Sequence, residues 1–421
     1  MKLDPEHPAP PVEEIRIGMI GLGGRGRSLL RELLKLPEGV EICVLADPDE
    51  AALDQAADLM REALRPPAEL RLGQEPAWMS VCQDPGLDLV IIASPWHLHA
   101  TQAVTAMSGR KHVFVEVPAA LTIEECWDLV NTSEQTSRYC ILLENCCFGR
   151  SELAGLNMVR SGLLGQITHT ECAYIHDLRE VLFRSSGEGL WRRGPHTRVD
   201  GNLYPTHGLG PVATCLDLNH GDRIERIVSM SSPEAALSEA ARDLPEGHPG
   251  RTEKFVTGDV NTSLLRTELG RSILVQHDVV SPRPYSRING LVGTRGSFFG
   301  FPDRLALDEH GAHEWLSEKE LKKMLKKYDS RLWSEQDEDP ESIGGHGGMD
   351  YVMMARLIDC LRTGRYPDID VYDAAAWSSI YPLSIDSVNY GSQPHSVPDF
   401  TRGWWKRTPR IFLPEEIGPT T

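Results

Sequence analysis

A glycine-rich segment near the start of the chain has the residue types and the spacing that bind a pyrophosphate. The pattern GxGxxG is formed by Gly21-Leu22-Gly23-Gly24-Arg25-Gly26, directly after a short apolar run, 15–20, and directly before a helical pattern of leucines. Glycines at these positions permit a tight turn and let backbone N–H groups approach the phosphates at the positive end of the helix dipole. Because GxGxxG alone also fits an ordinary turn, the flanking strand and helix are what favour a dinucleotide site.

An acidic residue stands where the ribose of such a dinucleotide would be bound. Asp47 ends the second expected strand and is followed closely by Asp49 and Glu50. A carboxylate about 20 residues beyond the glycines accepts hydrogen bonds from ribose hydroxyls. Since no arginine stands there to receive a 2′-phosphate, NAD is favoured over NADP, with Arg25 as the one nearby cation that would support the alternative.

Two further polar segments follow expected strands. Ser94-Pro95-Trp96-His97-Leu98-His99 comes after the apolar run 87–93, and Glu116-Val117-Pro118 comes after 113–115. Ligands of open α/β sheets lie beyond the carboxyl ends of the strands, so both segments are candidates for the nicotinamide half. The alternative for the two histidines is an exposed position at a helix start, and we expect this for one of them.

The elements that position these segments alternate between strand and helix. Strands are expected at 15–20, 40–46, 87–93, 113–115 and 139–143, with a helical pattern of leucines at 29–34 and helices at about 49–64 and 122–137. Nearly all-apolar strands are typical of a parallel sheet that is covered on both faces. The first 150 residues therefore predict a doubly wound Rossmann domain over 15–150, preceded by a flexible, proline-rich tail, 1–14.

After about residue 151 the pattern changes to longer, alternating stretches. Strands are expected at 167–175, 226–230, 260–269, 272–280 and 288–293, with helices at 152–160 and 349–362. This indicates an α/β domain with an open, largely antiparallel sheet over 151–421, whose C-terminal segment either stays with it or packs back on the first domain. A lysine-rich helix near 321–328 is expected to have a solvated face over a buried apolar face.

Composition excludes several classes of protein. The 421 residues carry 43 Lys and Arg against 61 Asp and Glu, a net charge of −18, which argues against a nucleic-acid or anionic-membrane binder. No apolar run reaches the ~20 residues of a membrane span, and the first residues lack the apolar core of a signal peptide. Nine cysteines without a CxxC pair predict reduced, mostly buried thiols, and no cluster has metal-ligand spacing, so we expect no catalytic metal.

The motifs of the first half resemble the Gfo/Idh/MocA oxidoreductase superfamily. The resemblance rests on the glycine motif, Asp47, the strand end SPxxxH and the E-x-P at Glu116-Val117-Pro118. It implies a Rossmann domain paired with an α/β domain whose open sheet faces the nicotinamide. Sugar dehydrogenases of the superfamily usually carry E-K-P, whose lysine assists proton movement, whereas this chain has Val117.

The second half resembles glycoside hydrolase family 109 more closely, and the likeness runs from about 15 to 405. The segments that carry it are Tyr174-Ile175-His176-Asp177-Leu178-Arg179, Trp191-Arg192, Gly201-Asn202-Leu203-Tyr204-Pro205-Thr206-His207-Gly208, Arg283-Pro284-Tyr285, 344–351, 370–373 and 398–401. The family implies an NAD-dependent N-acetylgalactosaminidase, typically acting on α-linked sugars. Many members carry a twin-arginine export signal that the start of this chain lacks, so a cytoplasmic location is expected.

The resemblance also implies the residues of both sites. Cofactor contacts are implied at Gly24, Arg25, Asp47, Trp96, His97, Leu98, His99, Glu116, Val117 and Asn145. Sugar contacts are implied at Tyr174, Arg192, Tyr204, Pro205, Thr206, His207 and Tyr285. It further suggests a homo-oligomer, a dimer or larger, that forms through the open face of the second sheet.

These sugar-site residues do not include the carboxylate pair of an ordinary glycosidase, and NAD-dependent glycosidases are a known exception to that scheme. Our hypothesis is a transient oxidation at C3 of the sugar, elimination of the glycosidic oxygen, addition of water at C1, and re-reduction. His207 would take the C3 hydroxyl proton, and Arg192 would bind substrate oxygens. Tyr174 and Tyr285 are the candidates for the C2 base and the leaving-group acid, with the roles undivided.

Three alternatives stay open. The first is a sugar dehydrogenase or other Gfo/Idh/MocA-type oxidoreductase with net NAD reduction, against which Val117 counts. The second is a dinucleotide-binding regulator without turnover, against which the tyrosine, arginine and histidine motifs count. The third is the same glycosidase mechanism acting on a β-anomer or another N-acetylhexosamine. His346 is either near the sugar or a helix-entry residue, and Trp404-Trp405 either stack on a sugar or pack on the core.

Overall fold

The computed structural model of the chain describes residues 3, 5–311, 313–336, 339, 342, 344–408 and 418. These residues form two compact units. The first takes the described residues up to 149 together with those of 332–378, and the second takes 150–331 together with 379–406. From the sequence we assigned 332–378 to the second domain, whereas the structure groups it with the first unit. Of the described residues at the C-terminal end, 407–408 group with the first unit and 418 with the second, while 409–417 and 419–421 lie outside the described residues.

The first unit is built on a six-stranded parallel sheet with the order β3-β2-β1-β4-β5-β6. Its strands are β1 (Ile15–Ile20), β2 (Val40–Asp47), β3 (Glu69–Leu72), β4 (Leu89–Ile92), β5 (His112–Val115) and β6 (Cys140–Leu142). The order reverses between β1 and β4, and ligands of such sheets bind beyond the strand ends at this switch point. The predicted Rossmann architecture is confirmed.

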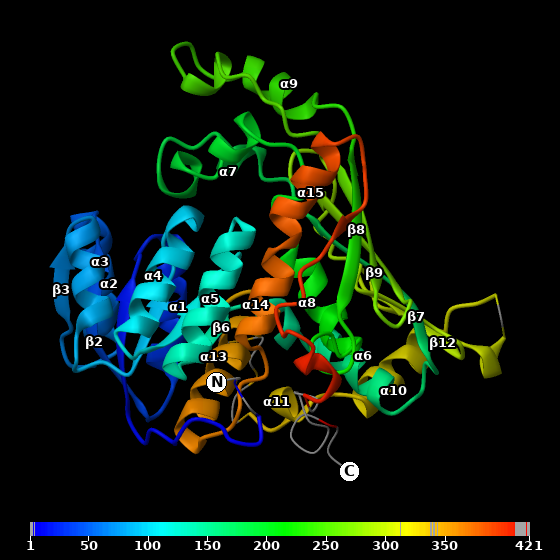
Figure 1. Cartoon of the computed structure of the whole chain (residues 1–421), viewed down its shortest axis with the longest axis horizontal. Coiled ribbons are helices and arrows are strands. Elements are labelled where there is room, and N and C mark those ends of the chain that lie inside the picture. Colours follow the sequence, from blue (N-terminus) through cyan, green and yellow to red (C-terminus); the bar gives the residue numbers. More distant parts are fainter. Residues whose placement is uncertain are drawn as a thin grey trace. The chain divides into compact units, whose positions relative to one another are not determined.

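Helices cover this sheet (Figure 1). They are α1 (Gly24–Lys35), α2 (Glu50–Glu62), α3 (Glu75–Gln83), α4 (Trp96–Ser108), α5 (Ile123–Thr136), the 3₁₀ turn η1 (Asn145–Phe148), α13 (Met349–Thr363) and α14 (Val371–Ser378). α13 packs against α1 and η1, and α14 packs against α5 and β6. These contacts join elements far apart in the sequence, which is why 332–378 belongs to the first unit.

The sequence prediction did not include several elements of this unit, among them β3 and α3. β3 is the edge strand of the sheet, and three of its four residues are exposed. An edge strand needs no continuous apolar run, because only part of it is covered, so the pattern that identified the other strands is weak here.

The segment before β1 is held against the first unit, in contrast to the flexible tail that we expected. Leu3 is buried, the backbone N–H of Ala9 donates to Tyr139 Oη at 2.6 Å, and that of Val12 donates to the carbonyl of Leu361 at 3.1 Å. A proline-rich composition therefore does not prevent this segment from packing, since its partners come from elements remote in the chain.

The second unit contains an eight-stranded sheet with the order β13-β12-β11-β7-β10-β9-β8-β14, antiparallel except for the pair β7 and β10. Its strands are β7 (Ile167–Ile175), β8 (Ile224–Ser231), β9 (Asn261–Thr267), β10 (Ser272–Asp278), β11 (Gly290–Gly293), β12 (Gly296–Phe299), β13 (Arg304–Leu307) and β14 (His395–Ser396). The expected open, largely antiparallel sheet is confirmed, and the three strands that were not expected are all four residues or shorter.

Helices of the second unit cover part of this sheet (Figure 1). α8 packs against β7 and β10, α15 against β8, and α6 against α8. The helical elements are α6 (Arg150–Arg160), α7 (Arg179–Leu182), η2 (Gly187–Leu190), η3 (Gly194–Thr197), α8 (Thr206–Cys215), α9 (Ala236–Arg242), η4 (Pro249–Arg251), η5 (Asp308–His310), α10 (Glu318–Lys327), α15 (Ile380–Asn389) and η6 (Trp404–Lys406), with α11 (Arg331–Ser334) at the boundary between the units.

The lysine-rich helix is less buried than we expected. The lysines of α10 are exposed, but Leu321, Met324 and Leu325 on its other face are only partly covered, and Tyr328 directly after it is the buried residue. Its amphipathic pattern therefore reflects a helix that lies at the surface of the unit.

Two expectations about the whole chain can be compared with the structure. All nine cysteines are free thiols, and eight of them are buried, as predicted. Within the described residues, no helix combines the length and the apolar character that crossing a membrane requires.

Candidate functional site

The glycine-rich loop leaves open space at the N-terminus of α1. A Cβ on Gly26 would lie 1.9 Å from the carbonyl oxygen of Gly21, and Gly21 itself has a φ of +86°, so these two glycines are required by the turn. A Cβ on Gly23 or Gly24 would meet nothing within 4 Å. The loop thus combines a tight turn with an uncovered helix N-terminus, and the residues present fit a pyrophosphate.

Asp47 at the end of β2 is fixed by the backbone of this loop. Its carboxylate accepts hydrogen bonds from the N–H groups of Leu22 and Asp49, the latter at 2.8 Å. Each carboxylate oxygen has a second lone pair, so the group remains able to accept from a ribose hydroxyl. The predicted ribose ligand therefore also helps to shape the glycine turn.

Arg25 lies in a network of buried charges that the sequence did not reveal. Its Nε donates to Glu116 at 2.6 Å, and its Nη1 and Nη2 donate to Asp350 at 2.6 and 3.1 Å. Asp350 also accepts from Asn145 Nδ2 at 2.8 Å and from His346 Nδ1 at 2.7 Å. A single carboxylate on α13 thus joins Arg25 and Asn145, two of the predicted cofactor contacts, and His346, just before α13, also belongs to this network.

The charges in this network stabilise one another. Burial alone would raise the pKa of the Asp350 carboxyl, but the hydrogen bond from His346 and the charge of Arg25 outweigh it and hold this pKa well below its usual range. Because the guanidinium of Arg25 is engaged by two carboxylates, it is not available as a cation for a 2′-phosphate. The alternative based on Arg25 therefore loses its support, and the site favours NAD.

The predicted contacts Trp96 to His99 form the first turn of α4. His97 is exposed, whereas His99 is buried, and its two ring nitrogens lie 2.7 Å from the carbonyl oxygens of Ser94 and Pro118. His99 therefore connects the polar segments after β4 and β5, and burial lowers its pKa. One histidine of the pair is exposed, as expected.

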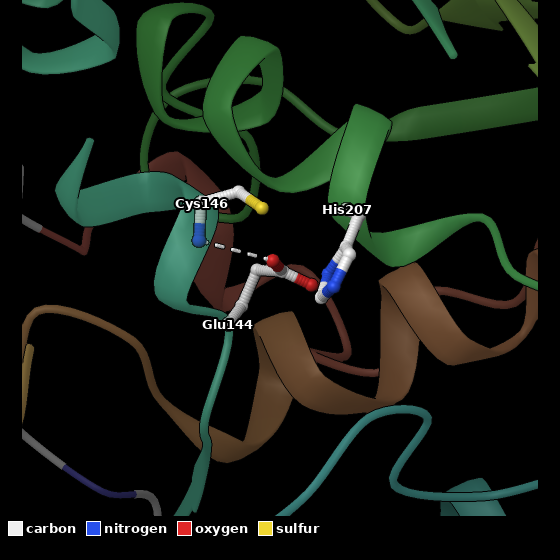
Figure 2. Close-up of side chains that lie close together, drawn as sticks. All are labelled: Glu144, Cys146 and His207. Carbon is white, nitrogen blue, oxygen red and sulfur yellow. Dashed lines mark hydrogen bonds between the residues drawn. The ribbon is translucent and has the colours of Figure 1, made fainter. Parts of the chain in front are cut away.

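Two other predicted cofactor positions are buried. Val117 is 2% exposed and offers no proton donor at the place where the superfamily's dehydrogenases have a lysine. Asn145 begins η1, and the carboxylate of Glu144 accepts a hydrogen bond from the N–H of Cys146 at 3.3 Å across that turn (Figure 2). Glu144 was not singled out in the sequence, and only its fully buried position draws attention to it.

In the second unit, three predicted sugar contacts form one aromatic cluster. Tyr174 lies near the end of β7, while Tyr204 and His207 lie at the start of α8, whose first turn carries His207 (Figure 2). The ring centroid of Tyr174 is 4.6 Å from that of Tyr204 and 5.3 Å from that of His207. The rings of Tyr204 and His207 are 4.8 Å apart. The motif YPTH and the end of β7 therefore build a single site.

Strand geometry adds Tyr285 to this cluster. Ile175 and Ser286 form an isolated antiparallel bridge. Because side chains alternate along extended chains, Tyr174 and His176 lie on the same face as Tyr285. The hydroxyl of Tyr174 and Nδ1 of His176 form a hydrogen bond of 3.0 Å, and the ring of His176 is 5.1 Å from that of Tyr285. His176, which belongs to a quoted motif but was not predicted as a site residue, thus connects the two tyrosines.

Arg192 is oriented over this cluster by an ion pair. Its guanidinium lies 5.0 Å from the ring centroid of Tyr204 and pairs with Glu188, one helical turn before it. Burial works to lower the pKa of Arg192, but Tyr174, Tyr204 and Glu188 outweigh it and raise this pKa above its ordinary value. A permanently charged fork is therefore held beside two phenol rings.

The two remaining predicted sugar contacts expose no polar side-chain group. Pro205 and Thr206 are buried, and Thr206 Oγ1 has no hydrogen-bond partner among the described residues. Within YPTH, Tyr204 and His207 thus carry the polar groups of the ring cluster. Trp405 is buried, as expected for packing on the core rather than stacking on a sugar.

Two buried histidines, which the sequence did not single out, lie near Arg192. Burial, together with the charge of Arg192, lowers the pKa of His196 to about 4. Burial, with smaller effects of His196 and Arg192, lowers the pKa of His277 to about 3. His277 is the neighbour of Tyr174 in the register of β10 and β7. Neutral imidazoles thus accompany the charged guanidinium at neutral pH.

Known proteins resemble the chain over nearly its whole length. Residues 15–143 match the family model of an oxidoreductase family with an NAD-binding Rossmann fold, and residues 148–407 match the model of the glycosyl hydrolase 109 C-terminal domain. A glycosyl hydrolase family 109 protein of Solibacter usitatus is 50% identical over 396 residues, which cover 93% of this chain and 89% of that protein. One of Shewanella amazonensis is 46% identical over 416 residues, covering 96% of this chain and 90% of that protein.

Solved structures with a similar fold are oxidoreductases. Levoglucosan dehydrogenase in complex with NADH and levoglucosan has a TM-score of 0.68 at 18% identity, covering 91% of this chain and all of that chain (100%). Scyllo-inositol dehydrogenase from Lactobacillus casei with bound NAD(H) and scyllo-inositol has a TM-score of 0.63 at 15% identity, covering 91% and 99%. At these identities the likeness concerns the fold.

Gly23→Ala should separate cofactor binding from folding. The backbone of Gly23 has a φ of −60°, which alanine adopts without strain, and its Cβ meets nothing within 4 Å. We expect an unchanged melting temperature and an NAD affinity at least about tenfold lower by calorimetric titration, because the methyl group fills the space for the pyrophosphate. Gly26→Ala is the matched control, in which the clash with Gly21 should lower the melting temperature. A Gly23→Ala protein that binds NAD like the unmodified chain would contradict the assignment.

His277 should make stability depend on pH. Since unfolded histidine binds a proton near pH 6.5 and folded His277 only near pH 3, the unfolded state binds more protons between these values. The free energy of unfolding should therefore fall as the pH falls through this range, with His277 contributing about 1.4 kcal/mol per pH unit. Denaturant unfolding of His277→Gln should show a shallower pH dependence than the unmodified chain, and His310→Gln at the exposed turn η5 is the surface control. Equal slopes for the two variants would argue against a neutral, buried His277.

Proposed function

The chain belongs to glycosyl hydrolase family 109, and we propose that it is an NAD-dependent glycosidase that hydrolyses terminal α-linked N-acetylgalactosaminides. The observation that carries the proposal is the cluster of Tyr174, Tyr204, His207 and Tyr285 in a chain with an NAD-binding Rossmann fold. Two carboxylates of the second unit near these side chains, Glu188 and Glu152, are both ion-paired with arginines. This arrangement suits proton transfer by phenols and an imidazole better than the two-carboxylate scheme.

When bound, NAD supplies a reversible hydride acceptor, which allows a sugar alcohol to be oxidised and reduced again within one turnover. In the proposed mechanism His207 takes the proton of the C3 hydroxyl during oxidation and returns it during re-reduction. An imidazole suits this exchange near neutral pH. The side chain of His207 is partly exposed at the first turn of α8, so a substrate hydroxyl can approach it.

The ketone at C3 acidifies the hydrogen at C2, and two proton transfers then cleave the glycosidic bond. A base takes the C2 proton while the C1–O bond breaks, and an acid gives a proton to the departing oxygen. Water adds at C1, C2 is reprotonated, and the net reaction is hydrolysis. Tyr174 and Tyr285 are the proposed proton carriers for these steps, because both phenols lie within the cluster.

Arg192 would bind substrate oxygens in this mechanism. A guanidinium offers several donors in a fixed plane, and the ion pair with Glu188 fixes its direction. The ring of Tyr204 beneath it supplies an aromatic surface. Together these groups would hold the sugar while its protons are exchanged.

A sugar oxidoreductase with net NAD reduction is the second candidate function. The solved structures with a similar fold are named as dehydrogenases, which favours it. Against it stands the buried Val117, which provides no proton donor at the lysine position of those enzymes. Hydrolysis of a β-anomer or of another N-acetylhexosamine by the same mechanism would be a variant of the first proposal.

We also propose that the chain forms a homo-oligomer through the open face of the second sheet. Met230 on β8 and Leu264 on β9 are 64% and 51% exposed on that sheet. Exposed apolar side chains on neighbouring strands are typical of a protein interface.

Incubation with an aryl α-N-acetylgalactosaminide in D₂O tests the mechanism. We expect release of the aglycone without net accumulation of NADH, and deuterium at C2 of the released sugar. His207→Phe should keep its affinity for NAD and lose at least about 100-fold in turnover, whereas His310→Phe should retain it. Accumulation of NADH without released aglycone would instead establish the oxidoreductase, and full activity of His207→Phe would remove this residue from the mechanism.

A further inference from the structure

A buried ion pair touches Tyr285, and the proposed mechanism does not yet use it. Arg287 and Glu152 are 4% and 7% exposed, and their side chains are paired. Arg287 Nη1 also donates a hydrogen bond of 2.8 Å to the hydroxyl oxygen of Tyr285. The phenol oxygen therefore accepts from a cation, while its partner in the cluster, Tyr174, is hydrogen-bonded to the imidazole of His176.

The backbone holds this arginine in place. The carbonyl of Arg287 accepts from the N–H of Ala173 at 2.8 Å, and Ser286 exchanges two hydrogen bonds of 3.0 Å with Ile175. The guanidinium also lies 4.9 Å from the ring centroid of Phe301. Because the chain directly after Tyr285 is paired with β7, the donor is fixed relative to the phenol.

The two tyrosines thus differ in electrostatic environment and in exposure. A positive charge beside a phenol favours its ionised form. Tyr285 is 40% exposed, so its proton can exchange with water, whereas Tyr174 is only 6% exposed. The base that acts at C2 must be ionised when it acts, and it must exchange its proton with solvent if deuterium is to enter C2.

We infer that Tyr285 is the base that takes the proton from C2, an inference that rests on the proposed function. Arg287 is then a positioning residue that favours the ionised form of Tyr285. Glu152 limits this effect by partly neutralising Arg287. Tyr174, paired with His176, is then the acid that gives its proton to the departing oxygen. When water adds at C1, its proton goes to Tyr174, and Tyr285 returns a proton to C2, so both residues recover their starting forms.

Several other ionisable groups surround Tyr285 and must be considered in a pH experiment. His176 and Tyr174 face its ring, with centroids 5.1 and 6.4 Å away. Arg283, two residues before it, is paired with Asp278. Burial raises the pKa of Asp303, to which the charge of Glu152 also contributes.

Ultraviolet difference titration tests the inference without any turnover. The ionisation of Tyr285 is the difference between each protein and the same protein with Tyr285→Phe. Arg287→Gln should raise the pH of this ionisation by about one unit or more, Glu152→Gln should lower it, and Arg287→Lys should largely restore it. The double variant Arg287→Gln, Glu152→Gln removes both charges and serves if either single variant fails to fold; it should behave like Arg287→Gln.

Activity then tests the role of Tyr285 as the base. The acidic limb of the kcat profile on an aryl α-N-acetylgalactosaminide should move in the same direction as each titration shift, and Tyr285→Phe should lose deuterium incorporation at C2. Unchanged ionisation of Tyr285 in Arg287→Gln, or deuterium at C2 in the Tyr285→Phe product, would overturn the inference. Absence of hydrolysis by the unmodified chain would refute the proposed function instead, while the titration would still report on Arg287.

Discussion

A buried guanidinium must be paired, because removing its charge from water costs far more than folding can supply unless a carboxylate compensates. Both candidate sites are organised around this constraint. In the first unit Arg25 lies between Glu116 and Asp350, and in the second unit Arg287 is paired with Glu152. Arg287 has a donor left after its ion pair, and this donor contacts the hydroxyl of Tyr285. The guanidinium nitrogens of Arg25 all pair with carboxylates, one of which, Glu116, is a predicted cofactor position.

The same constraint determines which groups remain for chemistry. The carboxylates Glu116, Asp350, Glu152 and Glu188 serve as partners of arginines, so they are poorly suited to act as the acid or nucleophile of an ordinary glycosidase. Within the second unit, the cluster of predicted sugar contacts then offers the imidazoles of His207 and His176 and several phenols, which are groups that transfer protons. The proposed use of NAD to weaken the glycosidic bond is consistent with such a set of side chains.

Much of the fold follows from local patterns. Apolar strands alternating with helical patterns identified the parallel sheet, and the alternation after residue 151 identified the antiparallel one, because burial on two faces or on one face leaves a different period in the sequence. The edge strand β3 and the short strands β12 to β14 were missed, since partly covered segments leave little pattern. The sequence placed 332–378 in the second domain, whereas the structure groups it with the first unit. The reason is that α13 and α14 contact elements more than 200 residues earlier in the chain.

The sequence by itself determined the glycine turn, the acid at the end of β2, and the motifs around Tyr174 and His207, because these features depend on backbone conformation and on residue types at short spacing. Only the tertiary structure showed that Arg25 is engaged by Asp350, that His99 is buried while His97 is exposed, and that Arg287 contacts the phenol of Tyr285. The reason is that pairing of buried charges joins residues remote in the chain. The spacing of residues in the sequence does not indicate which carboxylate pairs with a given arginine, although this partner determines which other groups the arginine can bind.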